Sequence, residues 1–252
     1  MTTMETKRRP RVERARQVAD VLRSEVLHGR VPLGGLPSEA ELGAEFGVSR
    51  NTVREAIEML RDEGLVVRCP GVGTLVSATK YDHGIDRLMG LAETLHEHGP
   101  VVNEVRTTSL VDPPKTVAER LDLRQGESVV YLERRRLLNG RPVSLDLTYL
   151  VRDLGEPLVA HDLAHSDIFA LLEQIAGTSL GHAELTLEAV AADAHSAAIL
   201  DTPRGSPLFM LERLTHLDGG RPVDLEFVRF RGDQVTMRGN IRRTSPQEGA
   251  PR

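Results

Sequence analysis

The chain has 252 residues, of which 40% are hydrophobic and only 3% are aromatic, so its length allows two ordinary domains with aliphatic cores. Its single cysteine, Cys69, excludes an internal disulfide framework, and the lack of a long apolar run or secretory signal argues against a membrane partner and favours a cytoplasmic location. The net charge of −5 conceals 13 basic against 11 acidic residues over residues 1–80 (+2) and 19 against 26 over the remainder (−7), which favours two domains with different partners.

The first predicted helix runs from about residue 15 to residue 28, where apolar residues recur at helical spacing after a polar segment over residues 1–14. A second, short helix is expected to end near Phe46. Ser38 is placed to cap its start, and Glu41, three residues later, completes a capping box. A glycine follows each helix, as expected at a helix end.

The third predicted helix begins after Ser49, its N-cap, and stops at Gly64. It is unusual in carrying Arg50 and Arg54 at its amino end, where cations oppose the helix dipole, so a negative partner outside the helix is expected. The buried side should carry Val53, Ala56, Ile57 and Leu60. Two short strands joined by a Pro/Gly loop follow over residues 65–77. Residues 1–77 therefore predict a helix-turn-helix with a wing.

DNA would supply that negative partner if the amino end of the third helix entered a major groove. There Arg can bind guanine, Asn can bind adenine, and Ser or Thr can bind phosphate. The alternative is a solvent-exposed helix face on which Arg54 pairs with Glu58, four residues on.

The stretch over residues 36–76, LPSEAELGAEFGVSRNTVREAIEMLRDEGLVV followed by GVGTLV, closely resembles the winged helix-turn-helix of the GntR family of bacterial transcription regulators. The resemblance implies a homodimer that binds double-stranded DNA at a palindromic operator. Ala40 and Val72 depart from the family pattern, which often has basic residues there, so we expect a different operator preference. The predicted DNA-binding residues are Ser38, Glu39, Ser49, Arg50, Asn51, Thr52, Arg54, Arg68, Gly71 and Gly73.

Residues 78–100 are predicted to form a linker with a helix over residues 85–96. Beyond it, the stretch 121–145 recurs as 200–225, at an offset of 79 residues before the hairpin turn and 80 after it. Asn139-Gly140 is a strong hairpin signal in the first copy. Further strands are expected over residues 101–110 and 182–190, with helices over residues 116–121, 167–176 and 193–200. This pattern predicts an α+β domain around a largely antiparallel sheet.

The second half resembles the ligand-sensing UTRA domain of the HutC subfamily, which implies a chorismate-lyase-like fold that binds an effector and dimerises. The dimer could form through the linker helix or the sensor sheet. The predicted limits are 1–77 for the DNA-binding domain, 78–100 for the linker, 101–240 for the UTRA domain and 241–252 for a disordered tail.

The resemblance also implies an effector site, in which an Arg-x-Arg and an acidic residue on the returning strand bind the ligand. We identify Asp224 as the counterpart of Asp146 in the second copy. Asp167 and Phe169 stand where phosphosugar sensors often have Ser and Tyr. A carboxylate would repel phosphate, so we expect an amine-bearing or zwitterionic effector rather than a phosphosugar. The predicted set is Arg134, Arg136, Asp146, Asp167, Phe169 and Asp224, with surface salt bridges as the alternative for the charged members.

The resulting prediction is a ligand-responsive repressor that needs no cofactor or metal and is not an enzyme. The histidines of the second half lack metal-ligand spacing, and Cys69 has no obvious catalytic partner. Two alternatives remain. One is a DNA-binding control protein without an effector, and the other is an enzyme related to the lyase that shares the sensor fold.

Overall fold

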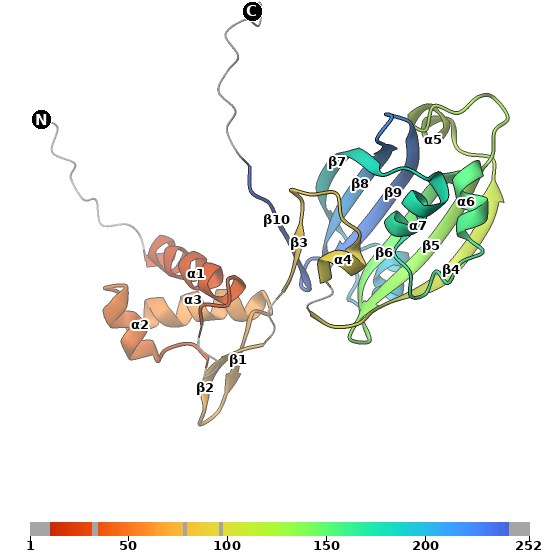
Figure 1. The fold of residues 1–252 in the computed structure, drawn as a ribbon. Helices are drawn as coiled ribbons and strands as arrows, with labels where there is room; N and C mark the ends of the chain where they lie inside the picture. Colours follow the sequence, from red (N-terminus) through yellow and green to blue (C-terminus); the bar gives the residue numbers. More distant parts are fainter. Residues whose placement is uncertain (1–10, 32–34, 78–79, 96–97, 242–252) are drawn as a thin grey trace, which may run out of the picture. The chain divides into compact units, whose positions relative to one another are not determined.

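The computed structural model describes residues 11–31, 35–77, 80–95 and 98–241, and the chain divides into two compact units, residues 1–80 and 81–252 (Figure 1). The first unit combines three helices with a two-stranded sheet, and the second is built on a six-stranded antiparallel sheet. The α+β fold class predicted from the sequence is confirmed.

The first unit contains the predicted helix-turn-helix and wing. Ser38 and Ser49 are the N-caps of the second and third helices, and Ser38 and Glu41 form the predicted capping box. The first helix begins at Arg11, earlier than predicted, and Arg11 binds Glu55 at 2.6 Å. The elements are α1 (Arg11–Leu27), α2 (Glu39–Glu45), α3 (Arg50–Asp62), β1 (Val66–Cys69) and β2 (Gly73–Val76).

An aliphatic core joins the three helices to the start of the wing. The buried residues of α3 are Thr52, Val53, Ala56 and Leu60. The last three form one cluster with Val18, Leu22 and Val26 of α1 and Leu42 of α2. Ile57, expected on the buried side, is partly buried. The inner face of α3 is thus rotated toward Thr52 relative to the prediction.

The second unit centres on a sheet of order β4-β5-β6-β9-β8-β7, in which every neighbouring pair is antiparallel. Helices α6 and α7 lie over one face of it (Figure 1). The elements are β3 (Tyr81–Gly84), α4 (Leu91–Leu95), β4 (Val101–Val111), α5 (Lys115–Arg120), β5 (Val129–Leu138), β6 (Arg141–Val151), α6 (Arg152–Leu158), α7 (Ile168–Ala176), β7 (Leu180–Ala191), α8 (Ala194–Ile199), β8 (Pro207–Leu217), β9 (Pro222–Arg231) and β10 (Val235–Arg238).

The internal repeat appears as two hairpins, β5–β6 and β8–β9, which meet where β6 pairs with β9. The backbone repeats as well, because Asp122 and its counterpart Asp201 have φ values of 51° and 49°. At the first hairpin turn Asn139 and Gly140 both have positive φ, as a tight hairpin turn requires. The duplication therefore extends from sequence to local conformation.

The helix predicted over residues 85–96 is wrong in its length, because helix α4 covers only Leu91–Leu95. Residues 81–84 instead form β3, which pairs in parallel with β10, more than 150 residues further along the chain. Such a distant pairing leaves no trace in local periodicity. We call residues 81–90, from the start of β3 to the residue before α4, the strap. Residues 242–252 of the predicted tail lie outside the described residues.

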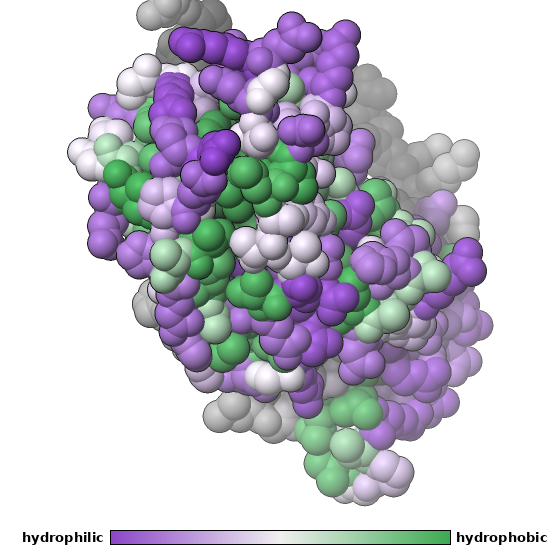
Figure 2. Space-filling model, turned by 90° about the vertical axis from the view of Figure 1, so that its right-hand side faces the viewer, coloured by the Kyte–Doolittle hydropathy of each residue, from purple (hydrophilic) through white to green (hydrophobic). Residues whose placement is uncertain are grey.

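Exposed apolar side chains of the sheet lie on its two edge strands. They include Val102, Val105 and Leu110 of β4 and Leu185 and Leu187 of β7. Figure 2 shows one side of the molecule, on which hydrophobic residues group near the middle and hydrophilic residues surround them. Among the described residues, no helix has both the length and the apolar character needed to cross a membrane.

Candidate functional sites

The amino end of α3 presents polar side chains to solvent, as predicted. Arg50, Asn51 and Arg54 are exposed. Thr52 differs from the prediction, because its side chain is only 5% exposed and its hydroxyl lies 2.9 Å from that of Ser49. Ser49 also accepts a hydrogen bond from the Thr52 backbone N–H. Thr52 therefore fixes the start of the helix from the inside, whereas Arg50, Asn51 and Arg54 face solvent.

A carboxylate links Arg54 of α3 to the wing. Arg54 donates from Nε to Glu39 at 2.7 Å, and Arg68 of β1 lies 3.7 Å from the other Glu39 oxygen. The predicted alternative, a pair between Arg54 and Glu58, does not form, because Glu58 pairs with Arg61 instead. Glu39 thus holds two cations of different elements on one surface.

A hollow of about 430 Å³ separates α2 and α3 from the wing, and its lining includes Ser38, Glu39, Arg50, Arg68 and Gly73. At the wing tip Gly71 and Gly73 have φ of 78° and 123°, and a side chain at either would meet open space. The predicted DNA-binding residues other than Thr52 therefore lie exposed or partly exposed around α3, the start of α2 and the wing.

In the second unit, a band of buried polar side chains crosses the four central strands of the sheet. Side chains alternate between the two faces of a strand, and the register places these residues on one face. We call them the polar band: Arg134 and Arg136 of β5, Ser144, Asp146 and Thr148 of β6, Asp224 and Glu226 of β9, and Arg213 and Thr215 of β8. Each is less than 9% exposed.

The first hairpin contributes a closed ionic group to this band. Asp146 pairs with Arg136 and lies 3.5 Å from Arg134, and it accepts a 2.8 Å hydrogen bond from Ser144. Burial lowers the pKa of Arg134 to about 10, and the charge of Arg136 adds to this effect. The alternative of a surface salt bridge is wrong for these residues, because all of them are buried.

The second hairpin repeats the arrangement and corrects one assignment. Arg134 faces Asp146 across β5 and β6, and in the same way Arg213 faces Glu226 across β8 and β9. The buried ion pair between Arg213 and Glu226 makes Glu226, not Asp224, the counterpart of Asp146. The offset of 80 residues after the turn gives the same result.

Arg213 connects the polar band to α7 and to the strap. Besides pairing with Glu226, it stacks over the ring of Phe169, with Cζ 4.4 Å from the ring centroid. It also donates a hydrogen bond of 3.3 Å to the carbonyl oxygen of Met89 in the strap. Phe169, a predicted effector residue, therefore supports an arginine that the sequence analysis missed, although the repeat could have revealed it.

Asp167 lies where the strap meets α7. It is the N-cap of α7, and its Oδ1 accepts a 2.9 Å hydrogen bond from the backbone N–H of Phe169. A Cβ added at Gly90 would overlap the Asp167 carboxylate, so the strap passes this point at a distance that only glycine allows. The charge of Asp167 acts on both Arg134 and Arg136.

Asp224 is the exception in the polar band. It is 1% exposed, and neither carboxylate oxygen has a hydrogen-bond partner among the described residues. Thr215 lies opposite Asp224 in the pairing of β8 with β9. Among the described residues, the hydroxyls of Thr215 and Thr148 also lack a hydrogen-bond partner. Burial raises the pKa of Asp224 well above its usual value, and the neighbouring charge of Glu226 raises it further.

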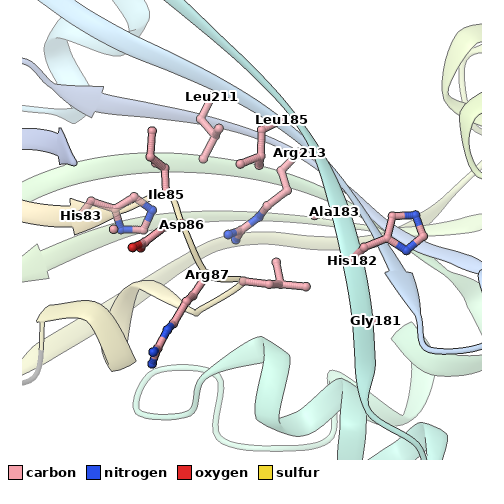
Figure 3. A pocket seen from close by; sticks show the side chains of 12 residues that line it. His83, Ile85, Asp86, Arg87, Gly181, His182, Ala183, Leu185, Leu211 and Arg213 are labelled. Carbon is pink, nitrogen blue, oxygen red and sulfur yellow. The ribbon is translucent and has the colours of Figure 1, made fainter. Parts of the chain in front are cut away.

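A cavity of about 240 Å³ lies between the strap and strands β7 and β8 (Figure 3). It meets the polar band at Arg213. His83 of the strap also lines it, with its ring centroid 5.3 Å from that of Phe230. Burial lowers the pKa of His83 to about 4, and the nearby Arg213 and Arg136 contribute, so this ring is neutral. His83 could not be predicted from the sequence, because no local pattern places the strap against the sheet.

Comparison with known proteins gives two family matches. Residues 14–76 match the bacterial regulatory proteins of the gntR family, and residues 97–236 match the UTRA domain. The HTH-type transcriptional repressor NagR of Bacillus subtilis is 30% identical over 88% of this chain and 91% of its own length. The histidine utilization repressor of Pseudomonas putida is 28% identical, over 82% of each chain. The crystal structure of PhnF from Mycobacterium smegmatis superposes with a TM-score of 0.66 at 24% identity and covers 90% of this chain and 100% of that one.

Proposed function

The chain belongs to the GntR family of regulators and carries a UTRA domain, and on this premise we propose that it is a repressor that a small-molecule effector releases from its operator. Like its relatives, it is a DNA-binding transcription regulator and not an enzyme. The repressor assignment is supported by NagR and the histidine utilization repressor, both of which are repressors.

We propose that α3 reads the operator through Arg50, Asn51 and Arg54. The observation that carries this proposal is the exposed amino end of α3, where the helix dipole and two arginines act together on a phosphate or base edge. We propose that Arg68, Gly71 and Gly73 make the wing contacts. Glu39 holds Arg54 and Arg68 until DNA replaces it as their partner.

We propose that the protein acts as a homodimer on a palindromic operator, in which each copy of α3 binds one half-site. We propose residues 1–77 as its DNA-binding domain. The sensor would follow a linker and extend to about residue 240. The strap falls within the predicted linker, but it packs as part of the second unit.

The proposed effector site is the polar band together with Asp167, Phe169 and the strap. The effector is not a phosphosugar, because both arginines of the Arg-x-Arg already share Asp146, and Asp167 adds a further negative charge beside them. A phosphate would have to compete with both carboxylates at once.

Fluorescence anisotropy tests the operator contacts. The DNA would be enriched from a random duplex library by the wild-type protein. Arg54→Ala should weaken specific binding by about 1–3 kcal/mol, since it removes a groove contact. Arg61→Ala is the matched control, because Arg61 lies at the other end of the same helix and pairs with Glu58. Equal losses for the two variants would contradict readout by the amino end of α3.

A further inference from the structure

The two copies of the duplicated hairpin carry opposite charge balances. The first copy places Arg134 and Arg136 around one carboxylate, Asp146. In the second copy Thr215 replaces the second arginine, and Asp224 replaces Ser144. The second hairpin therefore has one arginine for two carboxylates, and the surplus carboxylate is Asp224.

Among the described residues, no group donates a hydrogen bond to the Asp224 carboxylate, although the charges of three arginines act on it. The charged groups that act on Asp224 are Arg134 and Arg136 of β5, Arg213 of β8 and Glu226 of β9. Asp146 of β6, Asp167 at the start of α7 and His83 of the strap interact in turn with these arginines. All three arginines are already in contact with Asp146 or Glu226. His83 is neutral, so the cluster has three positive and four negative groups when every carboxyl is ionised.

Buried carboxylates without partners are costly, and such a group takes up a proton instead. Asp224 satisfies this description, since neither of its oxygens has a hydrogen-bond partner among the described residues. The unpartnered hydroxyl of Thr215 lies on the residue opposite Asp224, and that of Thr148 on the residue opposite Glu226, and both oxygens can accept a hydrogen bond. Two hydroxyl acceptors and one carboxylate suit a protonated nitrogen, which has several donors and one positive charge.

We propose that the effector carries a protonated nitrogen that pairs with Asp224, and that Asp224 is a neutral carboxylic acid until the effector binds. The acid proton leaves for solvent as the ammonium group docks, so the net charge of the site is unchanged by binding. The cavity beside Arg213 provides the approach, because it reaches the polar band at the ion-pair partner of Glu226. This inference rests on the proposed effector site and specifies its ligand class.

The test uses methylammonium as a minimal cationic probe and inorganic phosphate as the anionic one. Thermal unfolding of the full chain is followed at increasing probe concentration, at matched ionic strength, in the wild type and in Asp224→Asn. The amide imitates a neutral acid, so this variant is expected to fold. We expect methylammonium to stabilise the wild type saturably, with an affinity about tenfold or more above that for the variant. Phosphate should show no such difference.

Proton release gives a second readout that a structural role for Asp224 would not move. Below the pKa of Asp224, the affinity for methylammonium should rise by roughly tenfold for each pH unit, and this slope should vanish in Asp224→Asn. Equal responses of the two proteins to methylammonium, or stronger stabilisation by phosphate, would overturn the amine assignment. Operator binding by both proteins, measured in parallel, separates that failure from a failure of the proposed regulator function.

Discussion

Replacing Asp146 by asparagine should destabilise the second unit severely. Asp146 is 0% exposed, and it is the carboxylate against which Arg134 and Arg136 are held, at 1% and 7% exposure. The amide keeps the volume and the acceptor for Ser144 but removes the charge. Two buried guanidinium groups would then face each other, while Glu226 remains engaged with Arg213.

Removing one partner of a buried ion pair costs about 3–5 kcal/mol, because the other charge stays buried. For a unit of this size, each kcal/mol lowers the midpoint by roughly 2–4 °C, so the expected loss is roughly 6–20 °C. The whole stability of a domain is only about 5–15 kcal/mol. Asp146→Asn therefore removes a large share of it, and some of the protein should be unfolded at growth temperature.

Circular dichroism during thermal and urea unfolding measures the effect on the second unit. Glu104→Gln is the matched control, because it breaks the pair with Arg135 at the solvent-exposed side of the same sheet. Such an exposed pair contributes at most about 1 kcal/mol. Adding Arg136→Met to Asp146→Asn should recover part of the loss. A cost for Asp146→Asn as small as that of the control would refute the reasoning.

Three further substitutions test other parts of the structure. Glu39→Gln should leave unfolding within about 0.5 kcal/mol of the wild type, since the site is on the surface, but it should strengthen binding to random duplex DNA by freeing two arginines, which anisotropy would show. Gly90→Ala should destabilise the second unit by about 1–3 kcal/mol, because its Cβ overlaps the Asp167 carboxylate; an unchanged midpoint in calorimetry would contradict the close approach of the strap. Asp224→Asn should be more stable than the unliganded wild type at neutral pH. A raised folded-state pKa gives stability that is full below about pH 3.8 and is lost as pH rises toward the folded value, so the gain should disappear in acid.

The first unit could be predicted almost completely from the sequence, because its signals are local. Ser38 and Ser49 cap helices through residues three positions away, and glycine turns separate the elements. The departures are also local in origin. Thr52 turns inward because its hydroxyl and backbone N–H both bind Ser49, which no hydrophobic pattern reveals.

In the second unit the two hairpins could be predicted from the sequence, but the strap could not. Asn139-Gly140 specified the first turn, and the repeat specified the second. The strap escaped prediction because β3 finds its partner in β10, near the far end of the chain. The sequence prediction of the proposed effector site therefore lacks His83 and Met89, which reach the polar band only through this long-range pairing.

The duplicated hairpin also shows why stability and recognition can reside in two carboxylates of one sheet face. A buried ionic group stabilises a fold less than well-packed apolar residues of the same volume would, so a polar band across a sheet is a poor device for stability alone. In the first copy both buried arginines lie against Asp146, which we expect folding to require. In the second copy one carboxylate is left over, and the folded protein is strained by it. The same change, carboxylate to amide, should therefore destabilise the protein at position 146 and stabilise it at position 224. These opposite signs are expected if the carboxylate of the first hairpin is engaged by arginines and that of the second hairpin pairs with a cationic ligand.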